Sequence, residues 1–318
     1  MRPNLLLMCK LLLALLVLHG FASSLSDPFL PFISGLDLLR SPSGWLGRLL
    51  QISFIGAACC LVFNYRVRWA AVTLGVIVVL TLLSSRTVFR NHLFIVGCLF
   101  LLSGLQRKDD DAWMLRWQMV IIYGGAFLNK ILQVDWRSGQ FMHHWLHVEL
   151  ANPYYEAVWR ILPEPDLAII ISWCVMGSEL ALAILFLRRR WNAVAVSVAI
   201  VMHAGFFILV GRTIFGHFTE DVLLAMMAFL AWPSGVMAVR LKPSLQRSAQ
   251  ALRSWFDWER QLIFGTTLRD SGNWMELSAG DRTISNGAAT WHVLKYSPAF
   301  YFGVFGVFNG VAYLLAHY

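Results

Sequence analysis

Residues 167–187 read LAIIISWCVMGSELALAILFL, and this stretch decides the class of the fold. It contains one charged side chain, Glu179, and the basic run 188–190 follows it directly. An apolar run of about 18 residues or more can cross the hydrocarbon core of a bilayer as a helix. The stretch therefore predicts a transmembrane helix that ends at a basic turn.

The rest of the chain has the same apolar character. Of its 318 residues, 58% are hydrophobic and 14% are charged, whereas soluble domains carry roughly 45–50% apolar and about 25% charged residues. This composition excludes an ordinary soluble enzyme, a small disulfide scaffold and a disordered chain. We expect an all-α fold, a polytopic membrane helical bundle of about eight or nine transmembrane helices. The candidate spans are 3–22, 46–63, 69–84, 91–105, 116–133, 167–187, 191–211, 220–239 and 297–315.

The net charge of +8 suits either nucleic-acid binding or membrane orientation. The basic residues lie between apolar runs and not on one soluble face, which favours orientation and predicts no nucleic-acid partner. One set of alternate loops is richer in Lys and Arg, and it contains Arg66, Arg68, Arg107, Lys108, 188–190 and 240–253. We expect this set in the cytoplasm. Loops 23–45, 85–90, 134–166 and 212–219, which include Arg40 and Arg86, then face the opposite side.

The two ends of the chain differ from the central spans. Residues 1–22 fit either a cleaved signal peptide or, because Lys10 interrupts the apolar run, a retained transmembrane helix. We divide the chain into a transmembrane domain, 1–240, a cytoplasmic segment, 241–296, and a C-terminal transmembrane helix, 297–318. Within the cytoplasmic segment, apolar residues of 244–264 recur at helical spacing among arginines. That pattern indicates a basic amphipathic helix on the inner leaflet, or a solvated connector, before a turn-rich stretch.

Ionisable residues inside predicted spans are expensive and usually mark a function. Lys130 either acts as a base in surroundings that disfavour charge or extends to the interface. His203 is either a hydrogen-bonded core histidine or a proton carrier. Glu179 either pairs with a cation, carries a proton or joins packed helices. His92 opens the span 91–105.

Three histidines, His143, His144 and His147, lie close together in the loop 134–166. His143 and His147 are one helical turn apart and could share a metal ion, but no acidic residue completes a metal-binding pattern. The alternative is an interfacial helix that places Trp145 at the headgroup level. We therefore expect no metal site. The five cysteines lie in apolar runs without a CxxC motif, so we interpret them as small hydrophobic residues.

A central block of motifs resembles the HTTM (horizontally transferred transmembrane) domain, the membrane domain of vitamin K-dependent gamma-carboxylase. The block contains Asn91-His92-Leu93, Arg116-Trp117-Gln118, the run from Tyr123 to Lys130, Asp135-Trp136 and Gly139. Glu179, His203 and Phe215-Gly216-His217-Phe218 resemble later helices of that family. The resemblance covers roughly residues 1–240, and its specific part is 91–139.

The resemblance implies carboxylase-like (lyase) or quinol-dependent chemistry. By motif, Lys130 is the base that deprotonates vitamin K hydroquinone, and His92 and His203 take part in the chemistry. Tyr123, Trp136 and Glu179 would line the site of such an isoprenoid quinol, for which an apolar cavity is suited. The implied partners are the lipid bilayer and an isoprenoid quinone.

Two departures from the family pattern limit this implication. Trp136 follows Lys130 by six positions where the family pattern has about five, so Lys130 could be rotated away from the cavity. The large extracytoplasmic region that binds the carboxylase's protein substrate has no counterpart in this sequence, which argues against carboxylation of a protein.

Two functions of different classes remain open. One is quinol-dependent chemistry with Lys130 as base. The other is a non-enzymatic module, either a lipid- or quinone-binding protein or a membrane assembly or immunity factor. A transporter is less well supported because no paired repeat is visible. Convergence of Lys130 and His203 on one cavity would favour the enzyme. In either case we expect a multi-pass integral membrane protein, in the inner membrane if the source is bacterial.

Overall fold

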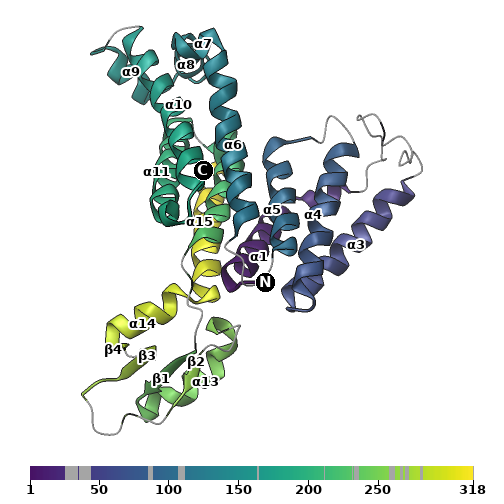
Figure 1. Ribbon diagram of the computed structural model, residues 1–318, viewed down its shortest axis with the longest axis vertical. Coiled ribbons are helices and arrows are strands. Elements are labelled where there is room, and N and C mark those ends of the chain that lie inside the picture. Colours follow the sequence, from purple (N-terminus) through teal and green to yellow (C-terminus); the bar gives the residue numbers. More distant parts are fainter. Residues whose placement is uncertain are drawn as a thin grey trace. The chain divides into compact units, whose positions relative to one another are not determined.

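The computed structural model divides the chain into two compact units, Met1–Leu230 and Ala231–Tyr318 (Figure 1). Each unit contains a hydrophobic core cluster of its own. Four basic residues of the predicted loop pattern, Arg40, Arg86, Arg107 and Lys108, lie outside the described residues. The described residues are 1–25, 35, 44–84, 89–106, 112–162, 165–210, 212–230, 232, 236–257, 262–265, 268, 272–279 and 282–317.

All regular secondary structure among the described residues of the first unit is helical. Its α-helices are α1 (Pro3–Leu18), α2 (Phe21–Ser24), α3 (Trp45–Val62), α4 (Val67–Ser84), α5 (Asn91–Leu105), α6 (Trp113–Leu132), α7 (Val134–Arg137), α8 (Gln140–His143), α9 (Pro153–Trp159), α10 (Asp166–Phe186), α11 (Asn192–Val210) and α12 (Arg212–Met226). A π-helix, η2 (His144–Glu149), and two 3-10 turns, η3 (Arg189–Trp191) and η4 (Met227–Phe229), complete it.

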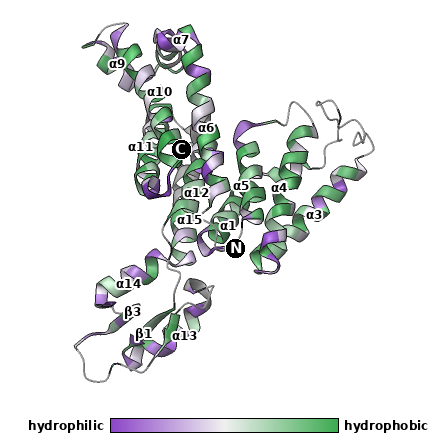
Figure 2. Cartoon of the chain, viewed as in Figure 1, coloured by the Kyte–Doolittle hydropathy of each residue, from purple (hydrophilic) through white to green (hydrophobic). Residues whose placement is uncertain are grey.

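Four helical stretches of the described residues are long and apolar enough to cross a membrane. They are α3, α4, α10 and the run Arg189–Phe207, which continues from η3 into α11. The helices α1 and α5 are also apolar but shorter, and hydrophobic residues extend along all of these elements (Figure 2). The chain is therefore mostly helical with several membrane-compatible helices, while a total of about eight or nine spans stays a prediction.

One predicted span, 220–239, is wrong. In its place α12 ends at Met226, η4 covers Met227–Phe229, and a β-strand begins at Met237. The apolar stretch is thus shared between the end of a helix and the start of a strand. Mean hydropathy over a long window cannot separate these two elements, because both are apolar.

The apolar helix α1 is part of the packed interior of the first unit. Leu5, Met8 and Leu12 on this helix are almost fully buried. Lys10, the one charge in the run, is also buried, and its Nζ donates to the carbonyl oxygen of Val62 at 3.0 Å. Val62 is the last residue of α3, where the helix dipole places partial negative charge. A cation within this apolar helix is therefore stabilised by a helix end.

The second unit contains a small mixed sheet, which departs from the all-α prediction. The strand order is β2-β1-β3-β4, where β1 is Met237–Leu241, β2 is Leu262–Phe264, β3 is Met275–Ala279 and β4 is Arg282–Ser285. The pair β1–β2 is parallel, and the pairs β1–β3 and β3–β4 are antiparallel. The sheet forms because β1 buries alternate residues, Met237, Val239 and Leu241.

Three helices accompany this sheet, namely α13 (Pro243–Phe256), α14 (Asn286–Lys295) and α15 (Pro298–His317). The predicted amphipathic helix, 244–264, forms only as α13; its last residues were predicted wrongly, because Leu262–Phe264 pair with β1 as strand β2. The predicted turn-rich stretch contains β3 and β4. Ala249 of α13 packs against the core of the sheet, and Arg253 Nη2 donates to the carbonyl oxygen of Leu262 at 2.7 Å. Part of the face that was expected to meet a lipid leaflet therefore contacts the sheet.

Candidate functional site

Lys130 and Glu179 form an ion pair between α6 and α10. Lys130 Nζ donates to Glu179 Oε1 at 2.6 Å, and the two side chains are 18% and 8% exposed. Lys130 lies in the last turn of α6, and Glu179 lies in the interior of α10. A charge in apolar surroundings requires a partner of this kind. Lys130 is therefore paired with a carboxylate. A lysine that only extends its ammonium group to the membrane interface would need no such partner.

The ring of Trp136 covers the ammonium group of this pair. Lys130 Nζ lies 5.0 Å from the ring centroid, and Trp136 itself is buried and stacked on Phe141 with centroids 4.5 Å apart. The backbone turns just after Trp136 at Gly139, where φ is +78° and an added Cβ would lie 2.6 Å from the backbone nitrogen of Ile169. Only glycine fits there. Because Lys130 Nζ lies over the Trp136 ring, the extra residue between them in the sequence does not separate their side chains.

A second polar pair joins Tyr123 to His203 between α6 and α11. The Tyr123 hydroxyl and His203 Nε2 are 3.0 Å apart, and His203 is 1% exposed. Phe186 stacks on Tyr123 with an interplanar angle of 3°. Tyr123 precedes Lys130 by two helical turns, so both pairs lie along one side of α6. His203 faces the interior and bonds across helices, as its mid-span position predicts; its catalytic role stays a prediction.

Two buried atoms of these pairs have no hydrogen-bond partner among the described residues. They are Glu179 Oε2 and His203 Nδ1. An unpaired buried polar atom costs roughly 1–3 kcal/mol, and such atoms are commonly satisfied by water or by a ligand. The two pairs can therefore accept or donate a proton, or receive the polar group of a ligand, at each of these atoms.

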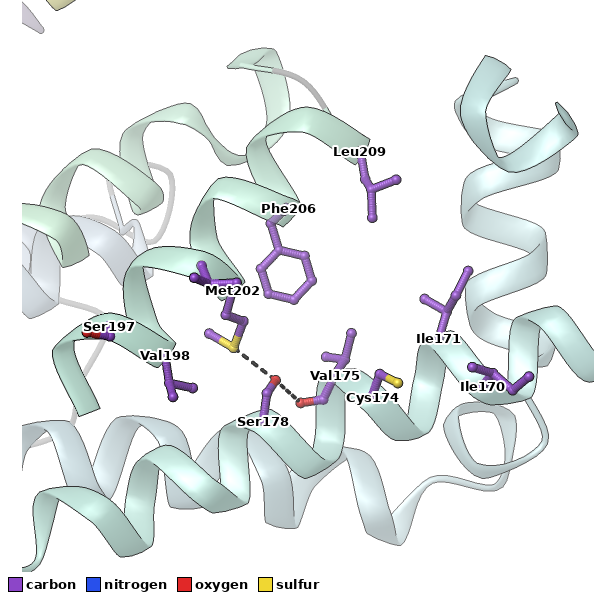
Figure 3. A pocket seen from close by; sticks show the side chains of 12 residues that line it. Ile170, Ile171, Cys174, Val175, Ser178, Ser197, Val198, Met202, Phe206 and Leu209 are labelled. Carbon is purple, nitrogen blue, oxygen red and sulfur yellow. Dashed lines mark hydrogen bonds between the residues drawn. The ribbon is translucent and has the colours of Figure 1, made fainter. Parts of the chain in front are cut away.

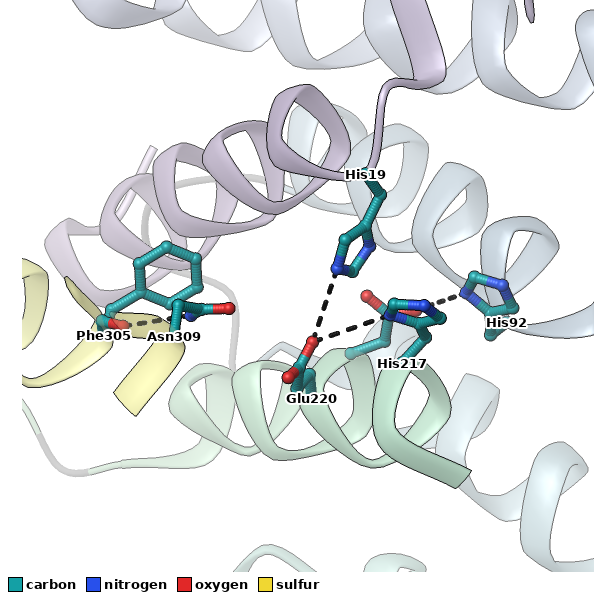
Figure 4. A network of polar contacts seen from close by, with 7 residues as sticks. His19, His92, His217, Glu220, Phe305 and Asn309 are labelled. Carbon is teal, nitrogen blue, oxygen red and sulfur yellow. Dashed lines mark hydrogen bonds and ion pairs between the residues drawn. The ribbon is translucent and has the colours of Figure 1, made fainter. Parts of the chain in front are cut away.

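His92 belongs to a different group of side chains. Its Nδ1 lies 2.9 Å from Asp221 Oδ2, which links the first turn of α5 to α12. Its ring also stacks on that of His217, with centroids 5.8 Å apart (Figure 4). Five of the six predicted site residues therefore gather around α6, and the sixth, His92, lies in a separate histidine cluster.

An apolar groove lies between α10 and α11, with a volume of about 540 Å³ (Figure 3). Ser178 Oγ donates to the carbonyl oxygen of Val175 at 2.8 Å and contacts Met202 Sδ at 3.1 Å. Glu179 and His203 follow Ser178 and Met202 in sequence, yet they do not line the groove, and neither does Lys130. Neighbouring positions on a helix differ by about 100°. The groove and the polar pairs therefore use different faces of the same helices. Its lining includes Cys174, Val175, Ser178, Met202, Gly205 and Phe206.

Two of the three clustered histidines, His143 and His147, pack on α9, whereas His144 is exposed. His143 Nδ1 lies 3.0 Å from the Tyr155 hydroxyl, and His147 Nδ1 contacts Glu156 Oε1. The chain passes from α8 into the π-helix η2 here, and Asn152 caps α9 by accepting from two backbone amides. His143 and His147 therefore have protein partners of their own, while the placement of this segment at a membrane interface stays a prediction.

Searches against protein-family models, curated proteins and solved structures gave no match to this chain. The likeness to the HTTM domain therefore rests on the residues of the central block alone.

Sequence reasoning did not identify Asp221, the partner of His92, or the nearby residues His19 and Glu220. Asp221 lies in a stretch interpreted as a span, where its charge was a visible but unused signal. His19 and Glu220, which lie beside His217, were likewise passed over (Figure 4). A further local signal was the spacing of His217 and Glu220, which puts them on the same side of a helix.

Proposed function

We propose that this chain is an HTTM-type integral membrane protein that binds a lipophilic ligand, an isoprenoid quinone or quinol, in the groove between α10 and α11. The observation that carries this proposal is the groove itself. Its volume of about 540 Å³ falls in the range of small-molecule sites, roughly 300–1,000 Å³.

The chemistry of the groove favours an isoprenoid tail over a polar ligand. Side chains such as Val175, Met202 and Phe206 provide an apolar, adaptable surface, and Ser178 supplies one hydroxyl. The groove is formed by two of the stretches that are long and apolar enough to cross a membrane. A ligand that already resides in the hydrocarbon layer can therefore enter from the side without passing through water.

Filling the groove tests the proposal. Gly205 lines it, and an added Cβ there meets nothing within 4 Å, so the side chain of Gly205→Leu can start into ligand space from an open position. The matched control is Gly177→Leu on α10, which has equally open surroundings and does not line the groove. Native mass spectrometry and lipid extraction should find a quinone on the wild type and on the control, and several-fold less on Gly205→Leu. Equal retention by both variants, or no quinone on the wild type, would reject the binding site.

The second candidate function is quinol-dependent chemistry with Lys130 as the base. It is supported by the gathering of Lys130, Glu179, Trp136, Tyr123 and His203 around α6. Lys130 and His203 do not converge on the groove between α10 and α11, which is why binding is the first proposal. In this mechanism Lys130 first transfers its proton to Glu179 Oε1 across the 2.6 Å hydrogen bond. The resulting neutral amine then takes a proton from the quinol hydroxyl, which leaves a quinolate anion beside the new ammonium group.

A guanidinium cannot serve as a base at neutral pH, so Lys130→Arg separates this candidate from pure binding. The variant keeps the positive charge opposite Glu179. The control is Lys10→Arg, which alters a buried lysine far from α6 in sequence. With vitamin K hydroquinone supplied in nanodiscs, Lys130→Arg should abolish quinol consumption and Lys10→Arg should retain it. Unchanged consumption in a well-expressed Lys130→Arg variant would exclude Lys130 as the base.

A further inference from the structure

Three segments far apart in the sequence bring histidines and acids together in the first unit. His19 follows α1, His92 opens α5, and His217, Glu220 and Asp221 belong to α12. His19 Nε2 lies 3.6 Å and His217 Nδ1 lies 3.9 Å from the same oxygen, Glu220 Oε2 (Figure 4). The rings of His19 and His217 meet edge to face, with centroids 3.9 Å apart.

The two acidic residues of this cluster are deeply buried, which is unusual for side chains that carry a charge. Glu220 is 6% exposed and Asp221 is 3% exposed. A buried carboxylate is expensive unless it is paired or coordinates a cation. Asp221 has His92 as a partner at 2.9 Å. Glu220 faces two imidazoles from longer distances, and an imidazole carries positive charge only when it is protonated. A divalent cation bound by Glu220 and these imidazoles would offset the cost of burying its carboxylate.

We propose that His19, His217 and Glu220 bind a divalent first-row transition metal, for which Zn²⁺ is the appropriate probe. Each residue contributes one ligand atom, and the three atoms lie within 4.8 Å of one another. Two imidazole nitrogens and one carboxylate oxygen form the donor set of several zinc and non-haem iron sites, which keep further positions open.

The distances fit such a site after a small closure. Bonds of about 2.0–2.1 Å in tetrahedral geometry place ligand atoms roughly 3.3 Å apart. The observed separations of 3.6 and 3.9 Å exceed this by only a few tenths of an ångström. His217 and Glu220 are one turn apart on α12, so a single helix carries two of the ligands, and side-chain rotations of the three residues would complete the closure.

Access to the cluster is consistent with the predicted orientation. The loops 23–45, 85–90 and 212–219 were all assigned to the non-cytoplasmic side from the distribution of Lys and Arg. His19, His92 and His217 lie in or beside these three loops, so their proximity agrees with that assignment. His217 is about half exposed, and a metal ion there would be reached from the non-cytoplasmic water.

Zinc titration of the full chain tests the site. The protein is purified through a tag without histidine, stripped with a chelator, placed in nanodiscs and titrated with Zn²⁺ by calorimetry. Co²⁺ absorption then reports on the ligand set. We expect one Zn²⁺ per wild-type chain. Removing a group that only orients a ligand weakens metal binding by roughly 10–100-fold, so His217→Ala and Glu220→Gln should each weaken it by at least about tenfold.

The matched control is His144→Ala. His144 is also a histidine beside a glutamate, 3.2 Å from Glu149, but both side chains are more than 60% exposed and lie in η2. This variant should bind Zn²⁺ as the wild type does. His217 is half exposed, so its replacement leaves the packed interior intact. Zinc binding that is unchanged in His217→Ala and Glu220→Gln, or no binding by the wild type, would overturn the proposal.

Discussion

The ion pair between Lys130 and Glu179 allows a quantitative test of the first unit. We consider three variants, Lys130→Met, Glu179→Gln and the double replacement, all of which nearly preserve side-chain volume. In the wild type the two charged atoms are 2.6 Å apart, and both side chains are mostly buried. Each single variant leaves one buried charge without its partner, whereas the double variant leaves none.

The expected magnitudes follow from that burial. Removing one partner of a buried pair costs about 3–5 kcal/mol, and replacing both is often nearly neutral. Lys130 is 18% exposed and can reach some water, so we take the lower end, about 3 kcal/mol, for each single variant. For a unit of this size, 1 kcal/mol shifts Tm by roughly 2–4 °C. Each single variant should therefore lower Tm by about 6–12 °C, and the double variant should recover most of that loss.

Tryptophan fluorescence during thermal unfolding in nanodiscs measures these shifts. The control is Glu149→Gln, which removes the charge from an exposed histidine–glutamate pair and should change Tm little. The informative quantity is the coupling between the two sites in the double-mutant cycle. If the double variant is destabilised by the sum of the two single effects, the pair has no coupling, and the argument that each charge requires the other is refuted.

Three further predictions test other parts of the fold. Gly75→Ala in α4 should destabilise the chain by about 1–3 kcal/mol, because the new Cβ would lie 2.5 Å from the Leu101 nitrogen. The control is Gly56→Ala in α3, where an added Cβ meets nothing within 4 Å, and it should stabilise the chain slightly in the same unfolding assay. An impermeant thiol reagent applied to intact cells should label Gln140→Cys and not Ser248→Cys, and the reverse would invert the topology. Burial and the nearby Lys295 lower the pKa of His292, so folding favours its neutral form and stability should fall as the pH drops through about 6.5. His292→Gln should remove that part of the pH dependence of Tm, and an unchanged pH dependence would contradict the assignment.

The long helices could be predicted from sequence because their signal is local. The stretch 167–187 becomes α10, and the run 191–211 becomes α11, each within a few residues of the expected bounds. Both the apolar length and the basic flank 188–190 are contained in one short window of sequence. Contacts between helices cannot be predicted from such a window, because the paired residues Lys130 and Glu179 are 49 positions apart. Each residue was singled out, but no local pattern indicated that they contact one another.

The sheet and the histidine cluster were missed for physical reasons of the same kind. Strand β2 has three residues and β4 has four, which is too short for alternation to stand out. Strand β1 alternates clearly, but it adjoins the apolar end of the first unit and was merged into the span 220–239. His19, His92 and His217 come from three helices, and only packing of α1, α5 and α12 brings them together.

Pairing across helices gives the buried polar residues two separable roles. The pairs Lys130–Glu179, Tyr123–His203 and His92–Asp221 each join two different helices. Each pair therefore fixes helix packing whether or not it takes part in chemistry. A loss of activity in a variant that breaks a pair cannot distinguish these roles, because stability falls as well. Lys130→Arg preserves the charge opposite Glu179 and removes the ability to act as a base, so normal stability with lost turnover would assign the chemistry to Lys130 itself.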